Sequence, residues 1–280
     1  MDHIIIERVR YDNLTNINTC NYPKNPNDTD IIDLDYATEI KKTNLMNYAE
    51  IINYPIAWSY EFGTDEIKLL IDISSNYIKN GETNKINENI NLIVDRLENV
   101  WPNTGQKYFF RFNSMSPKDG IPQFPVINAQ QVIHKIVTSK RAWNCMMEEE
   151  KAIHFAEYDN KWDPRREFRV FIYKRKITAI SQYNISIKNM LSGKSNIEAK
   201  QLVHNIQQYL ENDILPKICD IIKTDNLVCD IYVNSDSTLR IVEFNSFGYW
   251  LAAGSALFEW LDDKNKLYNT DGKIFLKIIK

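Results

Sequence analysis

Apolar residues recur at helical spacing in four stretches of the chain. They are Ile67, Leu70, Ile71 and Ile78 in the first stretch, Ile90, Ile93, Val94 and Leu97 in the second, Val132, Ile133, Ile136 and Val137 in the third, and Val203, Ile206, Leu210 and Ile214 in the fourth. Steps of three and four residues place such side chains on one face of an α-helix. The pattern therefore predicts helices in these stretches, the first from Thr64 to a stop at Asn80-Gly81, and the longest over residues 197–215.

Runs of apolar and aromatic residues between these helices predict strands. The expected strands cover residues 4–6, 107–112, 167–173, 177–183, 227–233 and 238–244. Residues 12–30 are polar and turn-rich, and we expect a loop or flexible arm there. Hairpins outnumber β-α-β units in this order, so the expected fold class is α+β.

Composition narrows the function without naming it. The chain has 280 residues, enough for one large domain or two lobes, and its net charge of −3 gives no reason to expect a nucleic-acid partner. No apolar run approaches the ~20 residues needed to span a bilayer, and the N-terminal apolar stretch is too short for a secretory signal. The four cysteines lack the spacing of a zinc site or redox pair, which favours reduced thiols in a cytoplasmic protein.

The stretch CDIYVNSDSTLRIVEFNSFG, residues 229–248, predicts a hairpin that carries acidic residues inside apolar strands. Asp230 lies in the first strand, and Glu243 and Asn245 lie in the second. A buried charge normally has a partner or a cation. Two carboxylates and an amide on one face would suit Mg²⁺. The alternatives are a polar face that meets water, or an ion pair with Arg169 or Arg240.

The register of this hairpin decides whether the three side chains meet. A turn over residues 234–237 would place Asp230 opposite Ile241, on the face of Glu243 and Asn245, whereas a slip of one residue would turn Asp230 away. If Asp230 and Glu243 face each other unpaired, Asp230→Asn should leave stability unchanged or raise it.

Two further stretches carry basic residues. In FFRFNSMSPKDG, residues 109–120, Arg111 precedes a loop with serine hydroxyls and backbone amides, a combination suited to a polyphosphate. The alternative is a turn with a solvated lysine and an arginine paired to an acid. In EFRVFIY, Arg169 could neutralise phosphate or form a structural ion pair. The acidic run at residues 148–150 is expected to be a solvated loop, and no catalytic constellation stands out.

These three elements, in this order, resemble the ATP-grasp fold and, more specifically, the cell division cycle protein 123 family of assembly chaperones. The matching stretches are RFNSMSPKDG at 111–120, EFRVFIY at 167–173, ITAISQY at 177–183, CDIYV at 229–233 and IVEFNSF at 241–247. The resemblance implies two lobes with antiparallel sheets and flanking helices, with ATP in a cleft between them. Residues 1–152 would hold the first lobe and residues 153–280 the second, which carries the metal-binding hairpin.

By position, the resemblance also implies site residues. The implied ATP contacts are Arg111, Ser114, Ser116, Glu157, Tyr158, Arg169, Asp230 and Asn245, and the implied Mg²⁺ ligands are Asp230, Glu243 and Asn245. The sequence departs from the family where Ser114 replaces a tryptophan, Tyr183 an arginine and Ser246 a proline, and HFAEY lacks a basic pair near Glu157. The implied floor of strands is kept, while the grip on adenine and phosphate is altered.

The resemblance implies a chaperone that binds ATP and Mg²⁺ and promotes assembly of translation initiation factor 2 through its gamma subunit. The alternative is an ATP-grasp carboxylate–amine ligase acting through an acyl phosphate, and a third possibility is a degenerate fold that no longer binds nucleotide. The same fold serves each of these. Phe258 and Trp260, in LFEWLDD, are expected either to anchor a protein partner or to pack in the core.

Overall fold

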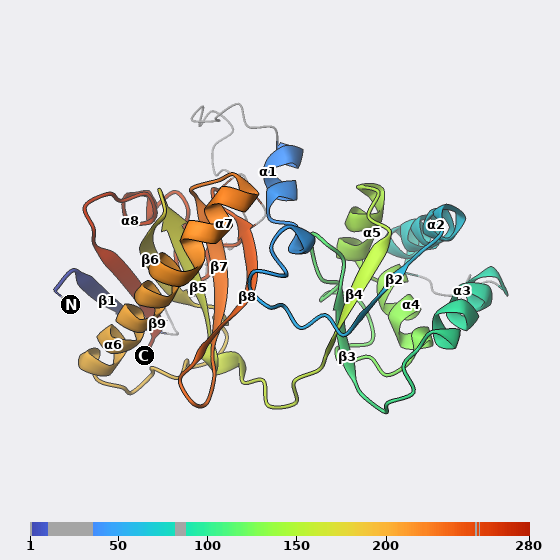
Figure 1. Ribbon diagram of the computed structural model, residues 1–280, viewed down its shortest axis with the longest axis horizontal. Helices are drawn as coiled ribbons and strands as arrows, with labels where there is room; N and C mark the ends of the chain where they lie inside the picture. The colour runs from blue at the N-terminus through green and yellow to red at the C-terminus, as the bar shows by residue number, and fades with distance from the viewer. Residues whose placement is uncertain (1, 11–35, 82–87, 250, 252) are drawn as a thin grey trace. The chain divides into compact units, whose positions relative to one another are not determined.

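The computed structural model describes residues 2–10, 36–81, 88–249, 251 and 253–280 (Figure 1). The arm expected at residues 12–30 lies outside the described residues. The chain forms two compact units, which are described one at a time: Met1–Tyr54 with Trp162–Lys280 make the first, and Pro55–Lys161 the second. The boundaries of these units differ from those of the expected lobes, because β1 (Ile4–Val9) and the segment before Pro55 pack with the C-terminal part of the chain.

A six-stranded sheet forms the centre of the first unit. Its order is β1, β9 (Ile274–Ile279), β6 (Lys176–Gln182), β5 (Glu167–Tyr173), β7 (Leu227–Val233) and β8 (Leu239–Ser246). The expected strands β5 and β7 are confirmed, whereas β9 was not predicted. The sheet is mixed. Strand β9 inserts between β1 and β6 and runs parallel to both, because the chain reaches it by a long crossover and not by a hairpin.

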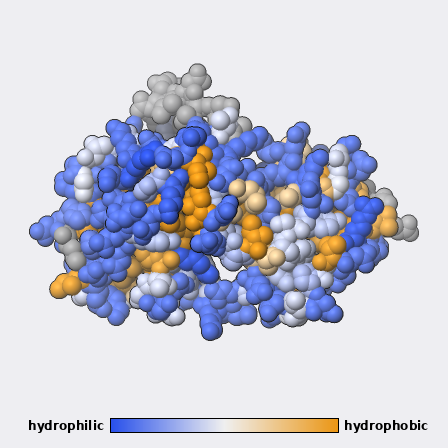
Figure 2. All heavy atoms as spheres, in the orientation of Figure 1, coloured by the Kyte–Doolittle hydropathy of each residue, from blue (hydrophilic) through white to orange (hydrophobic). Residues whose placement is uncertain are grey.

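A long helical segment covers one face of this sheet (Figure 1). It consists of α6 (Asn196–Gln208), a π-helical stretch (Tyr209–Ile214) and α7 (Leu215–Ile222), so it extends beyond the predicted end. The expected stripe of Val203, Ile206, Leu210 and Ile214 is buried. In Figure 2 the outer surface of these helices is mostly hydrophilic, while a strip of hydrophobic atoms lies beside α7 over β7 and β8. The segment is therefore amphipathic.

The N-terminal part of the first unit covers the outer edge of β8. It contains α1 (Tyr36–Lys42) and a 3₁₀ turn (Leu45–Asn47). The Phe244 backbone N–H donates to the Tyr48 hydroxyl at 3.1 Å, and the two rings meet edge to face with centroids 5.0 Å apart. This cover protects an edge strand whose backbone groups would otherwise be open to pairing with another chain.

The second unit packs helices on one face of an antiparallel three-stranded sheet. The strands are β2 (Trp58–Glu61), β4 (Ala152–Glu157) and β3 (Tyr108–Arg111), with β4 in the middle, and the helices are α2 (Thr64–Asn80), α3 (Glu88–Asn99), α4 (Ala129–Val137) and α5 (Lys140–Met147). The core between them includes Leu70, Phe110, Ile133 and Phe155. No helix in the described part of the chain is long and apolar enough to cross a membrane. The predicted α+β class is confirmed.

Candidate functional site

The hairpin of β7 and β8 brings Asp230 and Glu243 directly opposite each other. The register differs from the expected one in two ways. The connection is one residue longer, since Val233 pairs with Leu239, and a β-bulge between Asp230 and Ile231 shifts the pairing by one more residue. The first change alone would have turned Asp230 away, and the bulge turns it back. The expected common face is therefore reached by a different route.

Arg169 on β5 forms a two-pronged ion pair with Asp230. The two residues are directly opposite in the register, and Arg169 Nε and Nη2 donate to the two carboxylate oxygens at 2.8 and 2.7 Å. Arg169 Nη1 donates to the Gly254 carbonyl at 2.7 Å, and its guanidinium lies 4.9 Å from the Tyr183 ring centre. Asp230 is fully buried. The structure therefore contains the ion pair between Asp230 and Arg169, which was one of the alternatives left open by the sequence.

The interactions of this pair favour the charged form of Arg169. Burial by itself disfavours the charged guanidinium, yet the charge and hydrogen bonds of Asp230 raise the pKa of Arg169 above its ordinary value. Burial, followed by the charges of Asp230 and Glu243, raises the pKa of the neighbouring Cys229 thiol. The protonated thiol form of Cys229 is therefore favoured.

Asn245 lies between the two carboxylates. Its Nδ2 is 3.5 Å from Asp230 Oδ2 and 3.5 Å from Glu243 Oε1. A half turn of the amide would present its oxygen at the same place, because the two amide orientations differ little in shape. Two carboxylates and an amide oxygen would then lie next to one another on this face, and this donor set fits Mg²⁺. Among the described residues, no group of three or more His, Cys, Asp or Glu side chains could hold a metal, so the amide is an essential member of this candidate site.

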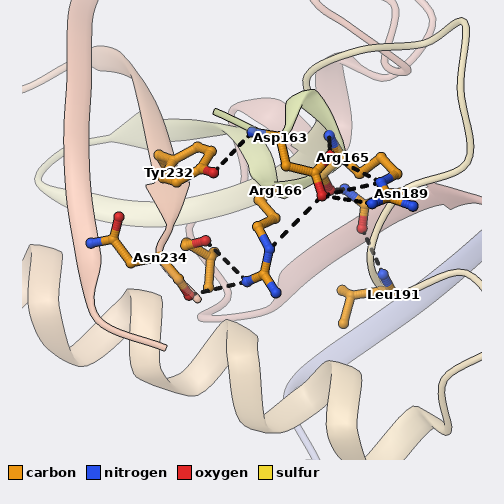
Figure 3. A network of polar contacts seen from close by, with 8 residues as sticks. Asp163, Arg165, Arg166, Asn189, Leu191, Tyr232 and Asn234 are labelled. Carbon is orange, nitrogen blue, oxygen red and sulfur yellow. Dashed lines mark hydrogen bonds and ion pairs between the residues drawn. The ribbon is translucent and has the colours of Figure 1, made fainter. Parts of the chain in front are cut away.

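The segment that leads into β5 is tied to the end of β7 (Figure 3). The Asp163 backbone N–H donates to the Tyr232 hydroxyl at 3.0 Å. Arg166 Nη1 donates to the carbonyls of Val233 and Asn234 at 3.2 and 3.0 Å. These contacts hold the start of β5 against β7, and so they help to keep Arg169 opposite Asp230.

The other five candidates lie in the second unit, and they are Arg111, Ser114, Ser116, Glu157 and Tyr158. Arg111 ends β3, and polar groups of the loop that follows are bonded within the same unit. The guanidinium of Arg111 is buried and donates to the carbonyls of Phe112 and Ser114, each at 3.2 Å. The Ser116 carbonyl accepts from Arg141 Nε at 2.7 Å. Arg111 therefore holds the backbone of its own loop, a contact that neither of the two expectations for this arginine included.

Lys135 on α4 fixes the far end of this loop, a role that the sequence did not reveal. The buried ammonium donates to the carbonyls of Gly120 and Pro122 at 2.9 and 2.8 Å and lies 4.1 Å from the Phe124 ring centre. Burial lowers the pKa of Lys135 to about 8. A Cβ at Gly120 would collide with the Lys135 carbonyl, so the close approach of loop and helix requires glycine there.

Glu150 also contacts the loop, although the acidic run at 148–150 was expected to be solvated. Its carboxylate accepts from the Ser114 backbone N–H, and this contact corrects that expectation for Glu150. Nothing in the sequence distinguishes Glu150 from the other two glutamates of the run, so its contact with the Ser114 N–H could not have been predicted.

Glu157 is the last residue of β4, the central strand of the second unit, and Tyr158 follows it. Glu157 is exposed and lies opposite Tyr108, and the Tyr158 backbone N–H donates to the Lys107 carbonyl at 2.7 Å. Both precede Lys161, where the second unit ends.

Phe258 and Trp260 are core residues, which decides between the two expectations for them. Both are buried, and they pack in one cluster with Phe171 and Phe247. The Trp260 indole N–H donates to the Ala253 carbonyl at 3.1 Å. The expectation that they anchor a partner is wrong, because their apolar surface is already used inside the first unit.

Comparisons with known proteins match the chain to one family in sequence. Residues 148–280 match the family described as D123. A CDC123-like protein of Acanthamoeba polyphaga mimivirus is 29% identical over 180 residues, which are 60% of this chain and 54% of that protein. The translation initiation factor eIF2 assembly protein of Candida albicans is 29% identical over 124 residues, which are 43% of this chain and 34% of that protein. The matches therefore span only about half and about a third of these relatives.

The fold agrees with this match. The structure of Cdc123 from Schizosaccharomyces pombe superimposes with a TM-score of 0.55 at 16% identity and covers 85% of this chain and 96% of that chain. At this identity the likeness concerns the fold alone. Residues 148–280 match the D123 family, and the chain has the fold of Cdc123, as the resemblance in sequence implied.

Proposed function

We propose that this protein binds ATP together with Mg²⁺ and acts in the cytoplasm as a chaperone in the assembly of translation initiation factor 2, through its gamma subunit. The observation that carries the nucleotide part is the convergence of Asp230, Glu243 and Asn245 on one face of the sheet. The partner is proposed because one relative bears the name of an eIF2 assembly protein.

The chemistry of the hairpin supports a metal bound together with a phosphate ligand. Asp230 already has its charge balanced by Arg169, and each carboxylate oxygen can accept more than one interaction. A Mg²⁺ ion here would be held by Asp230, Glu243 and the Asn245 amide, and it would supply the positive charge that lets phosphate oxygens approach two carboxylates. Arg169 would orient Asp230 throughout.

The candidates of the second unit are proposed as further ATP contacts. They are Arg111, Ser114, Ser116, Glu157 and Tyr158. Arg111 brings a fixed positive charge to the serine loop, and such a charge favours phosphate binding. Each can be tested by its own variant, separately from the hairpin.

Titration calorimetry with ATP tests the metal role. We expect binding in Mg²⁺ and its loss in EDTA, because phosphates and carboxylates repel each other without a cation. Glu243→Gln should weaken Mg-ATP binding by about tenfold or more, since one ligand charge is removed. Asp236→Asn, in the exposed turn of the same hairpin, should leave the affinity unchanged. Equal ATP affinity in Mg²⁺ and in EDTA would count against the metal site.

Capture from a Candida albicans lysate tests the partner. The immobilised protein, with and without Mg-ATP, should retain subunits of initiation factor 2, and the Candida assembly protein serves as the positive control. If the control retains them and this protein does not, the proposed partner is wrong. ADP release that depends on an added amine and carboxylate would instead support the ligase alternative.

A further inference from the structure

One row of polar side chains crosses the whole sheet of the first unit. Each member lies directly opposite the next in the strand register, and from β1 to β8 the row consists of Glu7, Lys277, Ser181, Arg169, Asp230 and Glu243. Side chains directly opposite each other on paired strands point to the same face of the sheet. Two of the candidate metal ligands therefore stand at one end of a continuous polar row.

The segment that follows β8 crosses this row, and we call residues 253–263 the strap. The Gly254 carbonyl accepts from Arg169 Nη1 on β5 at 2.7 Å, and the Leu257 N–H donates to the Ser181 hydroxyl oxygen on β6 at 3.0 Å. Ser181 is fully buried, and its own hydroxyl hydrogen is donated to the Gln182 carbonyl at 2.8 Å. The Ser181 oxygen therefore serves the strap as an acceptor.

The strap is held again at its other end. Asp263 Oδ2 accepts from Lys277 Nζ on β9 at 2.8 Å. Between the two ends, Ala256 has a φ of 52°, a left-handed conformation that is uncommon for a residue with a Cβ and persists only where the surroundings hold it. Ala256 directly precedes Leu257, so this conformation belongs to the turn that brings the Leu257 N–H to Ser181. The Ser181 contact is therefore an anchor in the middle of the strap.

Arg169 connects the strap to the hairpin. Its guanidinium is planar, so the contact of Nη1 with the Gly254 carbonyl also fixes the direction of Nε and Nη2. Those two atoms hold both oxygens of Asp230, at 2.8 and 2.7 Å. The last torsion of an aspartate side chain has a broad range, so the plane of the carboxylate is set by its partners. The direction in which Asp230 presents its oxygens to Asn245 and Glu243 therefore depends on the strap.

We propose that Ser181 is a positioning residue for the Mg²⁺ site. By anchoring the strap it keeps the Gly254 carbonyl on Arg169, and through Arg169 it holds the carboxylate of Asp230 in the orientation that binds the ion. The inference rests on the proposed function, because it takes the hairpin of β7 and β8 as an Mg²⁺ site. It assigns a role to a residue that the resemblance in sequence left without one.

The first measurement reads the position of Arg169 without any metal or nucleotide. Proton–nitrogen spectra of the guanidinium groups follow the exchange of the Arg169 Nε–H with water, and this signal is assigned through its loss in Arg169→Lys. We compare Ser181→Ala with Ser192→Ala, because Ser192 also makes a hydrogen bond to backbone of the first unit, to the Ile279 carbonyl at 2.8 Å, which is not part of the strap. We expect exchange to be about tenfold faster or more in Ser181→Ala and to change less than about twofold in Ser192→Ala.

The second measurement is a titration of the same variants with Mg-ATP. Ser181→Ala leaves the buried Leu257 N–H without its acceptor and loosens the strap over Arg169. We expect this variant to bind Mg-ATP about fivefold more weakly or worse, and Ser192→Ala to stay within about twofold of the unaltered protein.

The two measurements separate this inference from the proposed function. Unchanged exchange of the Arg169 Nε–H in Ser181→Ala would overturn the inference even if Mg-ATP bound more weakly. Faster exchange with unchanged Mg-ATP affinity would also overturn it, because the site would then not depend on the strap. If the unaltered protein does not bind Mg-ATP, the proposed function fails, and the exchange rates still show whether Ser181 holds Arg169 in place. Should Ser181→Ala not fold, Lys277→Met detaches the strap from β9 and is expected to produce the same two changes.

Discussion

At the scale of single residues, Asp230 is the position where the structure changes the argument most. The sequence left three partners open for it: water, an arginine or a cation. The structure supplies Arg169 through two hydrogen bonds, so the charge of Asp230 is balanced before any ligand binds. If Asp230 binds a metal, the same carboxylate therefore also serves the structural ion pair with Arg169.

Asp230→Asn is consequently expected to destabilise the protein, which reverses the expectation drawn from the sequence. The change would leave the Arg169 guanidinium buried without its counter-charge, and breaking a buried pair in this way costs about 3–5 kcal/mol. Urea unfolding at neutral pH measures the difference. Asp72→Asn, on the exposed face of α2, makes the same chemical change and should alter stability by less than about 0.5 kcal/mol. A stability of Asp230→Asn equal to that of the unaltered protein would show that Arg169 does not depend on this carboxylate.

The sequence could identify these residues but not their pairing. Arg169, Asp230, Glu243 and Asn245 stand out because charged and amide groups interrupt apolar strands. Their common face depends on the parity of the hairpin, which a longer connection and the bulge each change by one. Nothing local in the sequence marks that bulge. Contacts such as that of Glu150 with Ser114 join residues far apart in the chain, so they became visible only in the structure.

At the scale of elements, local patterns predicted the position of helices well, whereas they could not predict pairing between strands far apart in the sequence. The helix α2 spans the predicted residues, because its apolar spacing is regular and Gly81 adopts the left-handed conformation that ends it. Strand β9 was missed, since it is recognised only through its pairing with β1 and β6 at the opposite side of the sheet. The predicted end of the longest helix was too early, because the segment continues through a π-helical stretch into α7.

An ion network attaches the segment before α8 (Lys264–Leu267) to the strands β1 and β9. Asp263 accepts from Lys277 at 2.8 Å and pairs with Lys266 at 3.0 Å, and Lys266 also pairs with Glu7 at 2.7 Å. Burial by itself would raise the pKa of Asp263, but the hydrogen bonds from Lys277, the Glu259 N–H and Lys266 outweigh it and lower the pKa. The ionised carboxylate is therefore favoured in the folded state.

The pH dependence of Asp263→Asn follows from this direction. A carboxyl whose pKa is depressed by folding contributes stability above its unfolded pKa and loses that contribution as the pH falls through its folded pKa. We expect the variant to be less stable than the unaltered protein at pH 6–7, and the gap to shrink below about pH 4. Thermal unfolding across this pH range measures the gap. A gap that is constant with pH would mean that Asp263 acts through its shape and not through its charge.

At the scale of the whole molecule, the chain is divided in a way that the sequence did not indicate. The second unit is a single continuous stretch, Pro55–Lys161, whereas the first is assembled from both ends of the chain. The fold class and the family resemblance were accessible from motifs. The division was not, because it depends on β1 pairing with β9 and on Tyr48 covering β8, and both contacts connect distant parts of the sequence.

This division predicts different behaviour for two fragments. The core of the second unit is drawn from residues between Phe62 and Phe155, all inside the continuous stretch, so residues 55–161 should fold alone. Residues 162–280 should not, because without the N-terminal part β9 loses its parallel partner β1 and the edge of β8 loses its cover. Proton–nitrogen correlation spectra and thermal melts of the two fragments test this. We expect dispersed signals and a cooperative melt for 55–161, broad or collapsed signals for 162–280, and recovery when residues 1–54 are joined to 162–280 by a short flexible linker. A cooperative melt of 162–280 alone would show that β1 and the Tyr48 segment are accessories of the first unit and not parts of its core.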